Sequence, residues 1–192
     1  MINRLCILLL FALNLSTFNG YNINSYRNLE EKVRLETEFV ENGVKIEFNT
    51  GNDSESERKR IEKIIKENFS SEEKENKIDF NVWKEKNRSY ANIQIINKNK
   101  EMDTNEIKNK LKKFTDENSN EVKYFQYHKG KINKNLQEEY TKNLGKDFEM
   151  IEIENGYTGK IKLGKDNVNV GLINYDTGLN LIIGTPIIFT TY

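Results

Sequence analysis

Two neighbouring segments near the start of the chain show the clearest alternation of apolar and charged side chains. Residues 33–39 and 44–48 each repeat with a period of two, and Asn42-Gly43 lies between them. This period is typical of a half-buried strand, and Asn-Gly between two such runs is a strong hairpin signal. A two-residue turn would pair Phe39 with Ile46 and place both apolar sets on one face. The pattern therefore predicts a β-hairpin over 33–48.

Three later segments have the three-to-four residue spacing of an amphipathic helix. Residues 54–69 begin with a Ser-x-x-Glu capping box and carry the apolar stripe Ile61, Ile64, Ile65 and Phe69. Residues 103–114 begin with Asp103 and Glu106 and carry Ile107, Leu111 and Phe114. Residues 132–144 show a shorter pattern that ends at Gly145. We expect three helices with solvated charged faces.

The remaining alternating segments predict strands. They cover 78–82, 91–95, 122–127, 148–154, 158–163, 169–175 and 179–183. A five-residue loop, 155–159, keeps Ile153 on the same face as Ile161, which a two-residue turn at Asn155-Gly156 does not. Residues 176–178 predict a three-residue loop with Gly178 in the left-handed conformation. Pro186, the only proline, indicates a sheet edge or a bulge.

The order of these elements predicts an α+β fold, with helices on one face of a curved, mostly antiparallel sheet. Residues 21–32 are polar and suit a linker or a short helix. We expect a single domain over 33–192. A division into two halves, 33–120 and 121–192, is the alternative.

The N-terminal residues predict export. Arg4 is followed by the short apolar run Leu5–Leu15, which has the composition of a secretory signal. The run is shorter than the roughly 20 apolar residues that span a bilayer. We expect residues 1–20 to direct the chain out of the cytoplasm, to a secreted, membrane-associated or wall-associated location. Cleavage near Gly20 and retention as an N-terminal anchor both remain open.

Composition then restricts the chemistry that such an exported domain can perform. The only cysteine, Cys6, lies inside the apolar run, and the only histidine is His128. A typical catalytic zinc site needs three protein ligands, so we expect no metal and no cofactor. We expect His128 to be an exposed residue at a strand end. Equal numbers of basic and acidic residues, 30 of each, argue against a nucleic-acid partner.

Paired carboxylates are the one catalytic device that this composition allows. Glycoside hydrolysis requires only two suitably placed acidic side chains. We expect every Asp and Glu to lie on a solvated helix face or a polar strand face, where chance pairs are common. The sequence therefore assigns no catalytic residue. A carboxylate-dependent cell-wall hydrolase is the alternative function.

Trp83 and Tyr90 are the candidate binding residues. Ile78, Phe80 and Val82 occupy the core face of their strand, so Trp83 belongs to the opposite face. Tyr90 occupies the matching face of the next strand, and a hairpin closed by loop 84–89 would make the two rings neighbours. Such a pair can be a ligand platform or an interface hot spot. It can equally stiffen the hairpin or be covered by the same chain.

The C-terminal residues resemble a known family. Leu181–Ile188, followed by Thr191-Tyr192, is similar to the closing motif of the YwmB family, exported proteins of spore-forming Gram-positive bacteria. The resemblance extends over nearly the whole chain in its order of export signal, polar linker and α/β segments. It implies a fold like that of the TATA-box-binding protein, with helices on the convex side of a curved sheet. The family has no established function, so the resemblance transfers no site residues.

These observations predict a non-catalytic, extracytoplasmic interaction module of the cell envelope. We expect its partner to be an envelope protein or a cell-wall polymer, bound through the sheet face. Contact with a membrane is expected only through an uncleaved N-terminal segment. Minor-groove DNA binding requires a basic sheet with apolar wedges, whereas the strands here alternate Lys with Glu.

Overall fold

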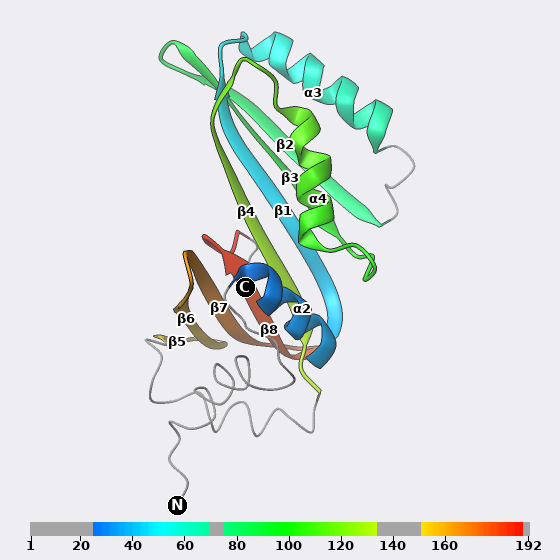
Figure 1. Cartoon of the computed structure of the whole chain (residues 1–192), viewed down its shortest axis with the longest axis vertical. Coiled ribbons are helices and arrows are strands. Elements are labelled where there is room, and N and C mark those ends of the chain that lie inside the picture. The colour runs from blue at the N-terminus through cyan, green and yellow to red at the C-terminus, as the bar shows by residue number, and fades with distance from the viewer. Residues whose placement is uncertain (1–24, 70–74, 134–150, 190–192) are drawn as a thin grey trace, which may run out of the picture. The chain divides into compact units, whose positions relative to one another are not determined.

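The computed structural model describes residues 25–69, 75–133 and 151–189 (Figure 1). The expected signal segment 1–20 and nearly all of the expected helix 132–144 lie outside these ranges. The elements, in chain order, are α2 (Tyr26–Glu36), β1 (Glu38–Thr50), α3 (Ser54–Asn68), β2 (Asn76–Glu85), β3 (Arg88–Asn97), α4 (Thr104–Leu111), the 3₁₀ helix η1 (Lys112–Phe114), β4 (Ser119–Lys131), β5 (Ile151–Ile153), β6 (Gly156–Leu163), β7 (Asp166–Tyr175) and β8 (Gly178–Thr185).

The predicted α+β class with a mostly antiparallel sheet is confirmed. The eight strands of the described ranges have the order β2-β3-β1-β4-β8-β7-β6-β5. The chain divides into two compact units. We call Glu41–Gln126 the central unit, and the described parts of 1–40 and 127–192 the terminal unit. One boundary lies between Gln126 and Tyr127, and the segment before residue 41 belongs to the same unit as the later part of the chain.

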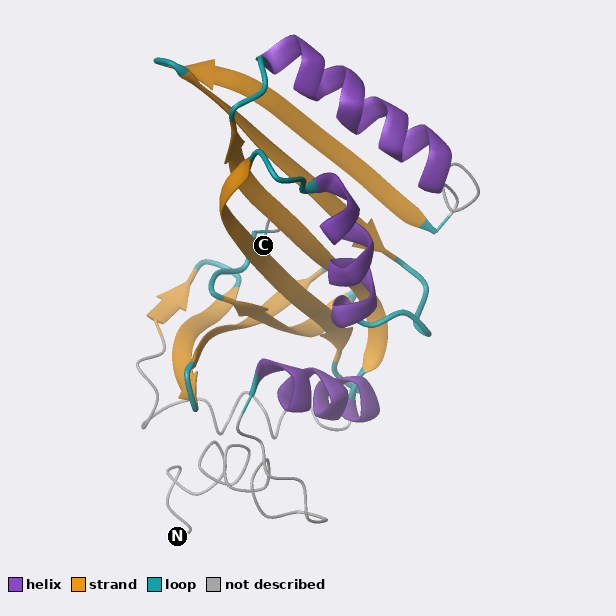
Figure 2. Ribbon diagram, turned by 45° about the horizontal axis from the view of Figure 1, so that its top comes forward, coloured by secondary structure: helices purple, strands orange, loops and turns teal. Residues whose placement is uncertain are grey.

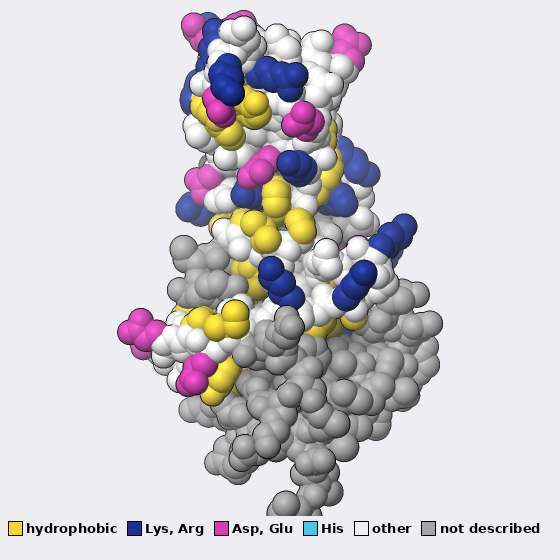
Figure 3. All heavy atoms as spheres, turned by 90° about the vertical axis from the view of Figure 1, so that its left-hand side faces the viewer, with side chains coloured by type: hydrophobic (Ala, Val, Ile, Leu, Met, Phe, Trp, Pro, Cys, Tyr) yellow, Lys and Arg dark blue, Asp and Glu magenta, His cyan; other side chains and the backbone are white. Residues whose placement is uncertain are grey.

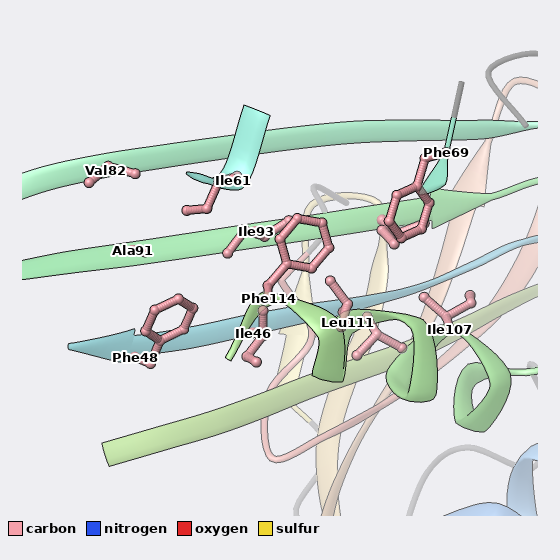
Figure 4. Close-up of a cluster of buried hydrophobic side chains, with 12 residues drawn as sticks. Ile46, Phe48, Ile61, Phe69, Val82, Ala91, Ile93, Ile107, Leu111 and Phe114 are labelled. Atoms are coloured by element: carbon pink, nitrogen blue, oxygen red, sulfur yellow. The ribbon is translucent and has the colours of Figure 1, made fainter. Parts of the chain in front are cut away.

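In the central unit, α3 and α4 cover one face of the strands (Figure 2). Alternate residues of β1, β2 and β3 meet the apolar stripes of both helices, as strand and helix periodicity require. Ile107, Leu111 and Phe114 extend from α4 and η1 toward the strands (Figure 4). The buried cluster contains Val44, Ile46, Phe48, Ile61, Phe69, Val82, Ala91, Ile93, Ile95, Ile107, Leu111 and Phe114.

Both helices of the central unit were predicted, but the N-cap of α3 was assigned one residue too late. Asp53, not Ser54, caps the helix, because its carboxylate accepts hydrogen bonds from the backbone N–H groups of Glu55 and Ser56. Asp53 Oδ1 lies 3.1 Å and 3.0 Å from these two nitrogens. The Asp103–Glu106 capping box of α4 is present as expected.

The hairpin predicted over 33–48 is wrong. Val33 belongs to α2, and β1 runs without interruption through Asn42-Gly43. The side chain of Asn42 is fully buried, donates to the carbonyl of Met102 (2.8 Å) and accepts from the amide of Asn97 (2.8 Å). These partners come from distant parts of the chain and satisfy Asn42 inside a strand, where local turn preference has no influence.

The α2 helix contains residues from both the expected linker and the expected first strand. Tyr26, Leu29 and Val33 are buried at helical spacing. The hydroxyl of Ser25 accepts a hydrogen bond from the Asn28 N–H (3.4 Å) and caps the helix. The polar segment 21–32 is therefore partly an ordered helix that contributes to the core. None of the helices in the described ranges is long and apolar enough to cross a membrane.

In the terminal unit, β7 and β8 pack against buried clusters on both faces. On one face, α2 packs against a cluster that includes Leu172, Leu181 and Ile183. On the other, Tyr127 packs with Ile173 and Ile182, among further partly buried hydrophobic residues. Unlike the central unit, this part of the sheet therefore has no polar face along β7 and β8.

The five-residue loop predicted over 155–159 is wrong. Ile153 pairs with Gly156 and Ile151 with Thr158, so the turn is only Glu154-Asn155. Ile153 packs on the Tyr127 cluster, whereas Ile161 packs on the α2 side. The prediction assumed that both isoleucines share one face, whereas the register of β5 and β6 places them on opposite faces.

The last hairpin was predicted with a loop one residue too long. Tyr175 pairs with Gly178, which leaves the two-residue turn Asp176-Thr177. Gly178 has a positive φ of 120°, as expected for the glycine of this turn. β8 ends at Thr185, directly before Pro186, because proline lacks the N–H group that would continue the ladder.

Candidate functional site

The helix-free side of the central unit forms a polar sheet face. Side chains that alternate with the core residues point away from α3 and α4. Three cross-strand rows result from the register of β2, β3 and β1, and we call this surface the open face. The rows are Trp83, Tyr90 and Asn49; Asn81, Asn92 and Glu47; and Asp79, Gln94 and Lys45.

Trp83 and Tyr90 are directly opposed, as predicted. Their ring centroids lie 5.6 Å apart, and the ring planes differ by 17°. The hairpin that joins them closes with the two-residue turn 86–87, tighter than the loop 84–89 expected from the sequence. Trp83 is 37% exposed, so stacking against Tyr90 leaves part of the indole accessible to solvent.

Charges on and beside the open face occur as pairs of opposite sign. Lys45 lies 2.8 Å from Glu47, and Lys77 lies 3.0 Å from Asp79. Asp79 also accepts a hydrogen bond from the Gln94 amide (3.2 Å). Figure 3 views the molecule from the side away from α3 and shows small hydrophobic patches flanked by both basic and acidic side chains. The face therefore presents little net charge.

Amide side chains occupy the middle of the open face. Asn81 is exposed, and Asn92 and Gln94 are half-buried. Each amide carries both a hydrogen-bond donor and an acceptor. Asn49 is 5% exposed, and its Nδ2 has no hydrogen-bond partner among the described residues. Aromatic and amide groups thus lie side by side on one surface.

The prediction that His128 is exposed at a strand end is wrong. β4 continues to Lys131, so His128 lies within the strand, and its side chain is fully buried. Its Nδ1 lies 3.7 Å from a carboxylate oxygen of Glu30 on α2, and its ring lies 5.6 Å from that of Phe39. Neither ring nitrogen has a hydrogen-bond partner within the described ranges. The residues around His128 in the sequence are mostly polar, so the sequence pattern did not indicate that its side chain is buried.

The expectation that all acidic residues are solvated is also wrong. Glu57 is fully buried in the central unit, where Arg60 forms an ion pair with it and Asn52 donates a hydrogen bond (2.8 Å). Burial opposes the charge on Arg60, but its hydrogen bond to Glu57 and the nearby carboxylates of Glu57 and Asp116 raise the pKa of Arg60 overall. This cluster joins α3 to the segment that follows η1.

Glu57 and Arg60 are three residues apart, which places them on one helix face. That spacing was the available sequence signal for the pair, although it does not reveal burial. Among the described residues, no group of three or more His, Cys, Asp or Glu side chains is arranged to hold a metal ion.

Comparison with known proteins identified no related protein. No model of a protein family matches the chain, and no curated protein or solved structure matches it significantly. The open face is consequently defined by its own geometry alone.

Proposed function

We propose that this chain is an extracytoplasmic, non-catalytic interaction module that binds a component of the cell envelope through the open face. The observation that carries the proposal is the accessible Trp83–Tyr90 stack on the side of the central unit opposite its helices. The Arg4–Leu15 pattern supports export, since it resembles a secretory signal.

The aromatic pair is better placed to bind a ligand than to stabilise the hydrophobic core of the central unit. The central unit buries its apolar cluster against α3 and α4, so Trp83 makes no part of that core. An exposed aromatic residue offers a large contact area at a small cost in side-chain entropy, which is why tryptophan and tyrosine are frequent hot spots. Their cross-strand stacking also holds the rings in place before a ligand arrives.

The motif Leu181–Ile188 links the proposal to the YwmB family, whose closing motif it resembles. If the chain is a YwmB-like protein, its units correspond to the two half-domains of a fold like that of the TATA-box-binding protein. Nucleic acid is not the proposed partner, because the ion pairs Lys45–Glu47 and Lys77–Asp79 leave the open face without the positive field that phosphates require.

A wall hydrolase is less well supported than a binding module. Within the described ranges, the two buried carboxylates are Glu30 and Glu57, which lie beside His128 and Arg60. Both are buried inside the fold, so neither is accessible to a ligand held by Trp83. No observation in the described ranges favours a pair of acidic groups around one scissile bond.

Sedimentation with isolated envelopes tests the proposed function. The purified chain would be mixed with wall and membrane fractions, pelleted and quantified beside Trp83→Ala and Tyr90→Ala. We expect the native chain to sediment with the envelopes and both variants to remain mostly in the supernatant. Circular dichroism of each variant establishes that the fold is retained.

Leu35→Ala is the matched control, because Leu35 is 79% exposed but belongs to the terminal unit. This variant should sediment like the native chain. Equal sedimentation of all variants would exclude the open face as the binding surface, and absence of sedimentation for the native chain would contradict envelope binding.

A further inference from the structure

Extending the proposed function, on which this inference rests, we propose that the open face binds an uncharged polysaccharide, a β-linked glycan strand of the type found in cell walls. The geometry that points to it is the juxtaposition of the Trp83–Tyr90 stack with the cross-strand amide pair Asn81–Asn92 and, one row further, Gln94.

The aromatic stack matches the apolar surface of a sugar ring. A pyranose in a β-linked chain presents axial C–H groups on its faces and hydroxyl groups around its edge. The C–H face can lie on the accessible part of Trp83, where burying apolar area is favourable and the negative ring face attracts the polarised C–H bonds. Tyr90 supports the indole from the neighbouring strand.

The amide pair Asn81–Asn92 matches the hydroxyl and acetamido groups at the sugar edge. Asn81 and Asn92 are cross-strand partners directly beside the aromatic row. Neighbouring strands lie about 4.8 Å apart, which is close to the length of one sugar unit in an extended glycan. Each amide can both donate to and accept from a hydroxyl group, so the pair suits a ligand rich in such groups.

The charges of the face favour a neutral ligand. Lysines 45 and 77 already have acidic partners at 2.8 Å and 3.0 Å, and the same holds for Arg88 with Glu121 at 3.6 Å. An anionic polymer such as a poly(glycerol phosphate) would have to displace these carboxylates. A neutral glycan leaves all three ion pairs in place.

The apolar area of the central unit favours a glycan over a protein partner. Trp83 and Val122 are its exposed large hydrophobic side chains in the described range. A stable protein interface usually buries about 800 Å² on each partner around an apolar centre. The aromatic pair is surrounded by amides and ion pairs, and the nearby ring of Phe125 is half-buried with Lys45 Nζ 4.6 Å from its centroid. This apolar area is too small for that centre, but it is sufficient to hold one or two sugar rings.

The fluorescence of the single tryptophan provides a direct test. Trp83 is the only tryptophan in the sequence, so any change in tryptophan emission from the chain reports on this surface. The chain would be titrated with the β-1,4-linked hexamer of N-acetylglucosamine, at low and high salt. We expect a saturable change whose midpoint is nearly independent of salt, because no ionic contact forms.

Variants locate the site. Asn81→Ala and Asn92→Ala should each weaken hexamer binding by about 3- to 10-fold, the effect of losing one hydrogen bond. Tyr90→Ala should weaken it further. Asn105→Ala is the matched control, because Asn105 is exposed on α4, on the helix side of the central unit, and should bind like the native chain.

The outcomes separate this inference from the proposed function. If hexamer and purified wall glycan leave Trp83 emission unchanged while Trp83→Ala still abolishes envelope sedimentation, the glycan inference is overturned and the module binds another component. Loss of sedimentation after protease treatment of the envelopes would then identify a protein. Binding that falls steeply with salt, or is stronger for poly(glycerol phosphate), would also overturn the neutral glycan.

Discussion

Nδ1 of His128 lies 3.7 Å from a carboxylate oxygen of Glu30, with side-chain exposures of 0% and 4%. The two residues connect β4 to α2 inside the terminal unit. Burying polar side chains has a desolvation cost, which contacts made inside the protein must offset. The two neighbouring side chains therefore contribute to holding α2 against β4.

Replacing one member of this pair should destabilise the chain more than replacing both. We expect Glu30→Leu alone to lower the free energy of unfolding by about 2 kcal/mol, because it removes the carboxylate that lies 3.7 Å from the fully buried His128 ring. Glu30→Leu with His128→Phe should recover part of that loss. Urea denaturation of both single variants and the double variant measures the coupling, and strictly additive losses would contradict it.

Gly130 should tolerate no larger residue. A Cβ atom at this position would lie 1.9 Å from Oγ1 of Thr37, which itself donates a hydrogen bond to the carbonyl of Val33 (2.7 Å). We expect Gly130→Ala to lower the free energy of unfolding by about 2 kcal/mol, as overpacking typically does. Gly51→Ala is the matched control, since a Cβ there meets nothing within 4 Å; it should leave the thermal midpoint nearly unchanged.

Asp53 should make the stability of α3 depend on pH in the acidic range. Hydrogen bonds from the Ser56 side chain and backbone, and from Glu55, hold the pKa of Asp53 below its ordinary value of 3.8. A lowered folded-state pKa stabilises the fold above the unfolded-state value, and this contribution is lost as the pH falls through the folded-state pKa.

Thermal melts of the native chain and of Asp53→Asn between pH 7 and pH 2 test this prediction. Asparagine is also a good N-cap but does not titrate. The difference between the two midpoints should shrink below about pH 4, near the ordinary carboxyl pKa. A difference that stays constant to pH 2 would show that the charge of Asp53 does not stabilise the helix.

Asn49 should be replaceable without loss of stability. Its Nδ2 is buried with no hydrogen-bond partner among the described residues, and such a donor costs about 1 kcal/mol or more. Valine removes the amide and suits a strand. We expect Asn49→Val to raise the free energy of unfolding by about 1 kcal/mol in urea titrations. A clear decrease would indicate that the Asn49 amide has a stabilising role.

The parts of the fold that were predictable from sequence depend on neighbouring residues. Asp103 and Glu106 cap α4 because they are three residues apart, and the apolar stripe of α3 follows from the helical period alone. The opposition of Trp83 and Tyr90 follows from a tight hairpin between two clear strands. Short-range geometry was sufficient in each case.

The errors arose where distant residues decide the outcome. Asn42 is held in β1 by Met102 and Asn97, which are 60 and 55 residues away, so its Asn-Gly turn signal was misleading. His128 is buried by α2, nearly a hundred residues earlier in the chain. Local periodicity contains no information about such partners.

Solvent quenching of Trp83 fluorescence tests the central claim most directly. Acrylamide quenches an accessible indole, and Trp83 is the only tryptophan in the chain. Purified chain would be titrated with acrylamide in the absence and presence of saturating isolated envelopes. Binding through the open face predicts a clear decrease in quenching when envelopes are present. Equal quenching, with the chain sedimenting alongside the envelopes, would show that binding occurs elsewhere and would contradict the account.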